Sequence, residues 1–295
     1  MSEHTPTPRF GPAGNSERFY QEGNKRTVET FAWQRAMGLT AFEYPFGRGI
    51  SLSDDTAVDI GQAAQEAGVT ISAHAPYYIN LGSNRADAID KSLGYILKAA
   101  HKLRLMGGER LVVHVGAPQK RPREDAISDA AEGLLKARRL LMEEGLQAIR
   151  LCLETMGKPS VLGTLEEIIT FVRLDDSFLP CVDFAHLHAA GGGALSSRAD
   201  FARVLDAVEQ GVGRERAAAM HVHFSHIEYG RSGEIRHRIF ADEGFGPDFA
   251  HLAPLLVQRG YAPTIICESR GTMADDAAEM LAMYNAARRK HTPVI

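Results

Sequence analysis

The sequence predicts a (β/α)8 TIM barrel of the α/β class, folded as a single domain. Eight short apolar or β-branched segments alternate with eight segments of helical periodicity. The 295 residues are enough for one such barrel. No low-complexity linker or change in composition marks a domain boundary. We therefore expect one domain over residues 1–295, in which residues 1–8 form a flexible tail.

The predicted strands succeed one another at residues 9–14, 41–47, 70–76, 110–116, 149–156, 179–186, 220–226 and 264–269. The first is the weakest candidate, because RFGPAG contains a proline and two glycines, which weaken a strand. Among the helical segments, 86–106 and 124–145 have the clearest pattern, with apolar residues at i, i+3, i+4 and i+7. A strand followed by a helix, repeated eight times, is the sequence form of the barrel.

The composition is typical of a soluble globular enzyme, at 44% hydrophobic and 24% charged residues. No apolar run is long enough to cross a membrane, and MSEHTPTPR has no apolar stretch typical of a signal peptide. Cys152, Cys181 and Cys267 stand singly in apolar runs, which predicts buried thiols. We expect a cytoplasmic monomer with no membrane association and no protein partner. The net charge of −4 gives no general attraction to nucleic acid.

A histidine or an acidic residue ends each of six consecutive predicted strands. These residues are His74, His114, Glu154, Asp183 with His186, His223 and Glu268, and the loop after the seventh strand adds Glu234 and His237. In this fold the carboxyl ends of the strands form the active-site face, so we expect these side chains to converge.

This residue set points to bound metal. Buried carboxylates are costly unless they are paired or bound to a cation. Imidazole and carboxylate together suit Zn²⁺, Mn²⁺ or Fe²⁺. Even without Glu234, the eight other residues are too many ligands for one ion, so the pattern predicts two or three metal ions bridged by carboxylates. Clustered ions of this kind activate water for phosphoester hydrolysis.

Six motifs occur in a fixed order between about residues 70 and 270: HAPYYINLGS (74–83), HVG (114–116), LET (153–155), VDFAHLHAAG (182–191), HFSH (223–226) and CES (267–269). Together they resemble endonuclease IV, a metal-dependent DNA repair enzyme. The resemblance implies a zinc centre and hydrolysis of the phosphodiester 5′ to an abasic site in DNA. Two or three Zn²⁺ ions are expected, with Mn²⁺ as an alternative.

Carried over by position, the resemblance implies that His74 and His114 hold one ion, which Glu154 bridges to a second. Asp183, His223 and Glu268 would complete the second site, and His186 with His237 would hold the third. Glu154 and Glu268 are thus the expected catalytic residues.

The chain departs from the family pattern in the loops. The family has an acid where this chain has Ile235, so either Glu234 or Asp242 substitutes for it, or the third ion is weak or absent. The loop after the second strand is short, and only Arg48 there could contact phosphate.

Contacts with DNA are expected from two loops. Tyr77 and Tyr78 could stack against bases, although tyrosines at such positions also pack under loops. Lys120, Arg121 and Arg123 could hold the phosphate backbone, although charged loops are commonly just solvated.

Two alternatives stay open. Glu154, Asp183, His223 and Glu268 also match the single-metal set of sugar isomerases and epimerases that share this barrel, which would leave four histidines without a metal. A scaffold protein with a degenerate site is the other alternative, and the complete ligand set argues against it. We expect His188, His221 and His226 to support ligands or fill the core.

Overall fold

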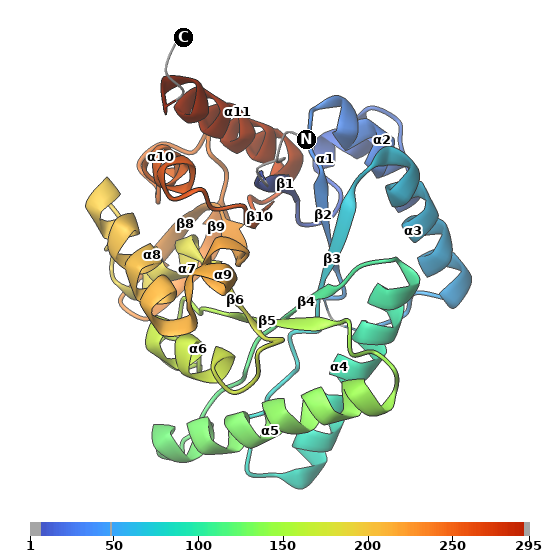
Figure 1. Ribbon diagram of the computed structural model, residues 1–295, viewed down its shortest axis with the longest axis vertical. Coiled ribbons are helices and arrows are strands. Elements are labelled where there is room, and N and C mark those ends of the chain that lie inside the picture. Colours follow the sequence, from blue (N-terminus) through green and yellow to red (C-terminus); the bar gives the residue numbers. More distant parts are fainter. Residues whose placement is uncertain (1–6, 48, 292–295) are drawn as a thin grey trace.

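Eight parallel strands form the central sheet of the structure, a computed structural model that describes residues 7–47 and 49–291 (Figure 1). They are β1 (Arg9–Pro12), β2 (Ala41–Pro45), β3 (Thr70–His74), β4 (Arg110–Val113), β5 (Arg150–Glu154), β6 (Leu179–Asp183), β7 (His221–Phe224) and β10 (Thr264–Cys267). Their order is β1-β10-β7-β6-β5-β4-β3-β2, and every paired neighbour is parallel. The two end strands meet, because the Thr40 amide donates to the Phe10 carbonyl at 2.9 Å. The predicted (β/α)8 barrel is confirmed.

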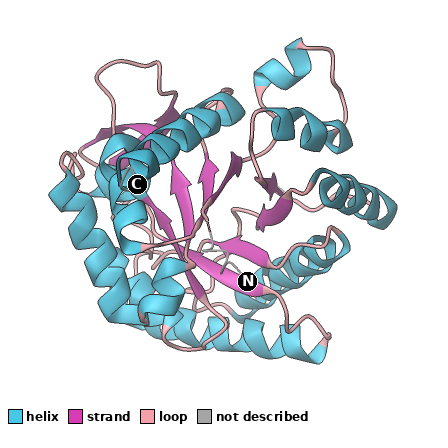
Figure 2. Cartoon of the chain, turned by 45° about the horizontal axis from the view of Figure 1, so that its top comes forward, coloured by secondary structure: helices cyan, strands magenta, loops and turns pink. Residues whose placement is uncertain are grey.

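Helices surround the strands (Figure 2). They are α1 (Glu17–Gln21), α2 (Thr27–Ala36), α3 (Asp54–Ala67), α4 (Ala86–Leu105), α5 (Arg123–Glu143), α6 (Leu165–Val172), α7 (Phe184–Ala190), α8 (Arg198–Val212), α9 (Arg214–Ala218), α10 (Phe249–Arg259) and α11 (Met273–His291). Their apolar faces pack on the strands and form one large buried core. In the part of the chain that the structure describes, no helix is both long and apolar enough to span a membrane.

The predicted strands lie in the right places but run two or three residues too far, because the residues after them belong to loops, to α7 after β6, or to the start of β8 after β7. The clearest helical segments correspond to α4 and α5. Of the predicted tail, residues 1–6 lie outside the described residues, and Pro8 is already buried. Arg48 also lies outside them. The three cysteines are free and buried, as expected.

Gly11 explains why a weak strand sequence nevertheless forms β1. A Cβ atom at this position would lie 1.7 Å from the carbonyl oxygen of Ala41 on β2. Only glycine lets the two strands approach this closely. The residue that weakened the strand prediction is therefore the one that lets the barrel close.

An antiparallel hairpin, β8 (His226–Gly230) and β9 (Gly233–Arg238), follows β7 where the sequence predicted only a loop. Arg231 and Ser232 form its turn, and the hairpin contacts α7. It carries Glu234 and His237 to the carboxyl end of the barrel, which makes it part of the candidate site.

Candidate metal centre

The predicted ligands converge at the carboxyl ends of the strands. Their ligand atoms lie within 4.8 Å of one another in three groups: His74, His114 and Glu154; Glu154, Asp183, His223 and Glu268; and His186, Glu234 and His237. We call these the first, second and third ligand groups. Glu154 belongs to the first two, so these two groups adjoin one another.

Glu154 occupies the centre and is 1% exposed. Its Oε2 lies 3.1 Å from His74 Nε2 and 2.9 Å from His114 Nε2, and its Oε1 lies 3.2 Å from His223 Nδ1. Burial opposes ionisation of this carboxyl, but the charges of His114 and His223 outweigh it and hold the pKa well below its usual value. Glu154 therefore presents one oxygen of an ionised carboxylate to each of two groups, as a bridging ligand does.

Asp183 is the last residue of β6 and caps α7. Its Oδ1 accepts a hydrogen bond from the His186 amide at 2.8 Å, which leaves Oδ2 buried without a hydrogen bond in the described structure. Asp183 is thus the N-cap of α7, and this hydrogen bond fixes its side chain relative to His186. Asp183 Oδ2 is free to bind a cation.

Three of the histidines have their Nδ1 atoms engaged by neighbouring oxygens. His74 Nδ1 lies 2.8 Å from the Ala75 carbonyl, and His186 Nδ1 lies 2.9 Å from the Thr155 carbonyl. A carbonyl only accepts, so each Nδ1 is the donor and the lone pair lies on Nε2. His237 Nδ1 similarly contacts Ser225 Oγ at 2.7 Å. Each Nε2 is thereby left to bind metal, as is usual when a ligand histidine is oriented by an outer partner.

The third group obtains its acid from Glu234. Its Oε2 lies 3.4 Å from His186 Nε2, whereas Asp242 pairs with Arg238 and Ile235 is 57% exposed. Gly157 makes this approach possible, because a Cβ there would lie 2.8 Å from the Cβ of Glu234.

Five carboxylates gather in and under this site, and all of their ion pairs within the described residues are with histidine. They are Glu43, Glu154, Asp183, Glu234 and Glu268. No lysine or arginine of the described chain balances them. Buried carboxylates are costly unless they are paired or bound to a cation, and this cluster of carboxylates and imidazoles fits a multinuclear divalent metal centre.

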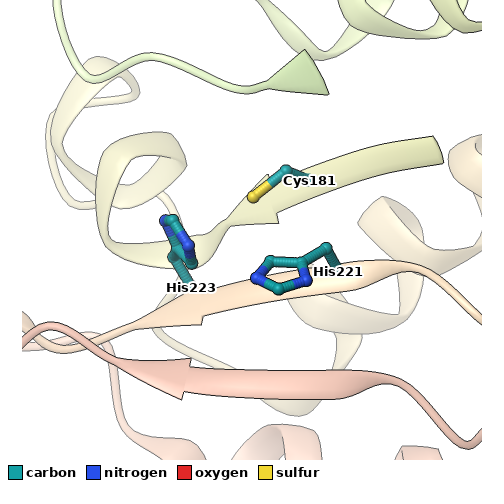
Figure 3. A group of neighbouring side chains, drawn as sticks. All are labelled: Cys181, His221 and His223. Carbon is teal, nitrogen blue, oxygen red and sulfur yellow. The ribbon is translucent and has the colours of Figure 1, made fainter. Parts of the chain in front are cut away.

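Glu43 on β2 was not identified from the sequence. It is 1% exposed and lies 2.9 Å from both His221 Nε2 and His223 Nε2. Burial opposes its ionisation, but His223 and His221 together lower its pKa below the usual value. His221 and His223 form a further group with Cys181 on β6, whose sulfur points toward the two rings (Figure 3). The sequence signal was present, since an acid within an apolar strand needs a partner.

The expected DNA contacts divide into two kinds. Tyr77 and Tyr78 are 55% and 56% exposed, and the Tyr77 ring lies beside the rings of His74 and His114. Tyr77 lines two cavities of about 310 and 230 Å³ at the mouth of the site. Arg270, which the sequence did not single out, is exposed and lines the larger one.

The basic loop after β4 has mainly internal partners. Arg121 pairs with Asp129 at 2.8 Å, and Arg123 pairs with Glu167 through contacts of 2.5 and 2.8 Å. Arg123 also donates to the carbonyls of Pro159 and Val161. These contacts give both arginines a role in holding loops together, whereas Lys120 is exposed.

Comparison with known proteins agrees with this architecture. Residues 31–286 match the family model described as xylose isomerase-like TIM barrel. An uncharacterized protein of Methanocaldococcus jannaschii is 31% identical over 255 residues, covering 85% of this chain and 89% of that protein. Endonuclease 4 of Thermus thermophilus is 30% identical over 238 residues, covering 75% of this chain and 84% of that protein.

Solved structures show the same fold. The crystal structure of endonuclease IV from Thermus thermophilus superposes with a TM-score of 0.69 at 23% identity, over 96% of this chain and 100% of that one. A D-tagatose 3-epimerase-like protein gives a TM-score of 0.70 at 18% identity, over 96% and 98%. The chain therefore belongs to the xylose isomerase-like TIM barrel family, with endonuclease 4 among its relatives.

Proposed function

We propose that the protein is a metal-dependent phosphodiesterase that cleaves DNA 5′ to abasic sites. The observation that carries this proposal is the presence of three ligand groups around Glu154, which itself belongs to two of them. A centre with several ions suits phosphoester hydrolysis, since bound ions lower the pKa of water and neutralise charge on the phosphate. The relatives named endonuclease 4 support the same activity.

The chain's own residues supply position and charge. Glu154 spans the first two groups, and Asp183 and Glu268 fill the second. We propose that the exposed rings of Tyr77 and Tyr78 stack against bases at the lesion, where an unpaired site costs little to open. Lys120 and Arg270 would contact backbone phosphates.

A sugar isomerase or epimerase is the second candidate. The second ligand group alone offers three acids and a histidine, enough for one divalent ion. The epimerase-like structural neighbour has the same fold. The other two groups weigh against this candidate, because the histidines in them would bind no metal in a single-ion enzyme.

Two measurements on protein purified without chelator test the proposal: metal content per chain, and incision of a duplex containing one abasic site. The proposal expects about three zinc ions and cleavage 5′ to the lesion, with an undamaged duplex left intact. Glu154→Gln and Glu268→Gln should each lower incision at least about 100-fold while thermal unfolding stays cooperative. About one ion per chain, no incision and ketose epimerisation would replace this proposal with the second candidate.

A further inference from the structure

The barrel interior beneath the metal centre contains a carboxylate that belongs to none of the three ligand groups. Glu43 reaches from β2 to two histidines of β7, at 2.9 Å from His221 Nε2 through Oε2 and 2.9 Å from His223 Nε2 through Oε1. Ser72 on β3 donates to Oε2 at 2.9 Å. All four side chains are at most 2% exposed. Contacts from the adjacent strand β3 and from β7 across the barrel interior thus hold this carboxylate in one place.

His223 is oriented in the opposite sense to the other histidines of the centre. His74 and His186 donate from Nδ1 to backbone carbonyls and present Nε2 to the ligand groups. His223 instead presents Nδ1, which lies 3.2 Å from Glu154 Oε1 and 3.5 Å from Glu268 Oε1. A neutral imidazole has one N–H, so a His223 that binds metal through Nδ1 must carry its proton on Nε2.

Glu43 is the carboxylate placed to accept that proton. Within the described structure, neither His223 Nε2 nor Glu43 Oε1 has a hydrogen bond to any other group, and the two atoms lie 2.9 Å apart. No backbone carbonyl takes the role that Ala75 and Thr155 play for His74 and His186. The side chain of Glu43 substitutes for a main-chain acceptor.

We infer that Glu43 is a positioning residue, which holds His223 as the Nε2–H tautomer with Nδ1 directed at the second ligand group. His221 and Ser72 fix Glu43 from the other side. The inference rests on the metal centre proposed above and extends it to a residue that touches no ion. Carboxylate, histidine and metal in series are a common arrangement, in which the carboxylate orients the ring and strengthens it as a ligand.

The same residues could instead hold an ion of their own, because Cys181, His221 and His223 form a group with ligand atoms within 4.8 Å (Figure 3). Geometry favours the positioning role. All three side chains are fully buried, and His223 would have to give one ring nitrogen to each of two ions. A variant at Cys181 separates the two cases, since the acceptor in the positioning role is the carboxylate of Glu43 and not the thiol.

The first test is zinc affinity, measured by competition with a chelating indicator on the full chain. Glu43→Gln should lower the zinc affinity of the second ligand group about 10- to 100-fold, as expected for loss of an orienting partner. Cys181→Ser is the matched interior control and should keep both the zinc count and the affinity. Thermal unfolding of each variant reports whether the fold is retained.

The second test needs no variant and stands even if Glu43→Gln fails to fold. Nitrogen NMR of the zinc-loaded wild-type chain, labelled at histidine, should show the imidazole proton of His223 on Nε2 and those of His74 and His186 on Nδ1.

Unchanged zinc affinity in Glu43→Gln, or an Nδ1–H tautomer of His223, would overturn the inference. Loss of one zinc in Cys181→Ser would also overturn it and assign the cluster to a buried ion. The outcomes are separable from the proposed function, because tautomers and zinc affinity do not depend on whether DNA is cut.

Discussion

Replacing Glu234 with alanine tests whether the hairpin completes the third ligand group. Glu234 is the only carboxylate of that group in the described structure, and it lies 3.4 Å from His186 Nε2. The two histidines should keep their places in the variant, because Thr155 holds His186 and Ser225 contacts His237. The substitution therefore removes one ligand and leaves the rest of the centre intact.

The expected loss is one metal ion per chain. The third group falls from three protein ligands to two, while the first and second groups keep three and four. A catalytic zinc site ordinarily has three protein ligands, so two histidines alone should not retain the ion through dialysis. Metal content should fall from about three ions to about two, and incision should fall at least about 100-fold.

Elemental analysis after dialysis at a fixed free zinc concentration measures this change. Ile235→Ala is the matched control, because Ile235 is the next residue of β9, is 57% exposed and belongs to no ligand group. Adding Ile235→Asp to Glu234→Ala should not restore the ion, since Ile235 lies at the β-bulge of the hairpin and its side chain is 57% exposed, outside the ligand group. A Glu234→Ala protein that keeps its full metal content would refute the assignment, as would an equal loss from Ile235→Ala.

Three further predictions concern loops and closure. Arg123→Ala should destabilise the fold by about 1–2 kcal/mol at neutral pH, because it breaks a paired contact with Glu167, and Lys120→Ala should not. Burial opposes ionisation of Glu167, but Arg123 and two backbone amides hold its pKa below the usual 4.5. The part of this difference that comes from Glu167 should be complete above pH 4.5 and be lost as the pH falls through the lower folded-state pKa, whereas the part from the carbonyls of Pro159 and Val161 should remain. Denaturant titrations at several pH values would measure this, and a difference independent of pH would contradict the pairing with Glu167. Tyr78→Ala should weaken binding to abasic DNA by about 1–3 kcal/mol with metal content unchanged, and equal affinity by fluorescence anisotropy would return Tyr78 to a packing role. Gly11→Ala should destabilise the barrel by about 1–3 kcal/mol or prevent its folding, and urea unfolding at wild-type stability would contradict the close approach of β1 to β2.

The strands and most of the ligands could be predicted because their signals are local. A buried strand is an apolar run of fixed length, and a ligand such as Glu154 stands at its end. Asp183 and His186 are likewise linked by one helix cap. The hairpin could not be predicted from the alternation of strands and helices, because β8 and β9 follow one another directly around a turn at Arg231 and Ser232.

Other roles depend on partners far away in the chain, so the sequence alone could not assign them. Arg123 looked available for DNA, yet its partner Glu167 lies 44 residues later on another helix. The partners of Glu43 could be identified only from the folded barrel, in which His221 and His223 of β7 face Glu43 across the interior. For such residues the sequence shows that a charge needs a partner, and the fold decides which one.

The β8–β9 hairpin supplies ligands that no barrel strand carries. The eight barrel strands and the residues directly following them supply every ligand of the first and second groups, whereas two of the three ligands of the third group belong to one connecting segment. The third ligand group can therefore be changed by exchanging a single loop, while every barrel strand keeps its sequence. A barrel built in this way can alter its candidate site through a loop change that leaves its core untouched.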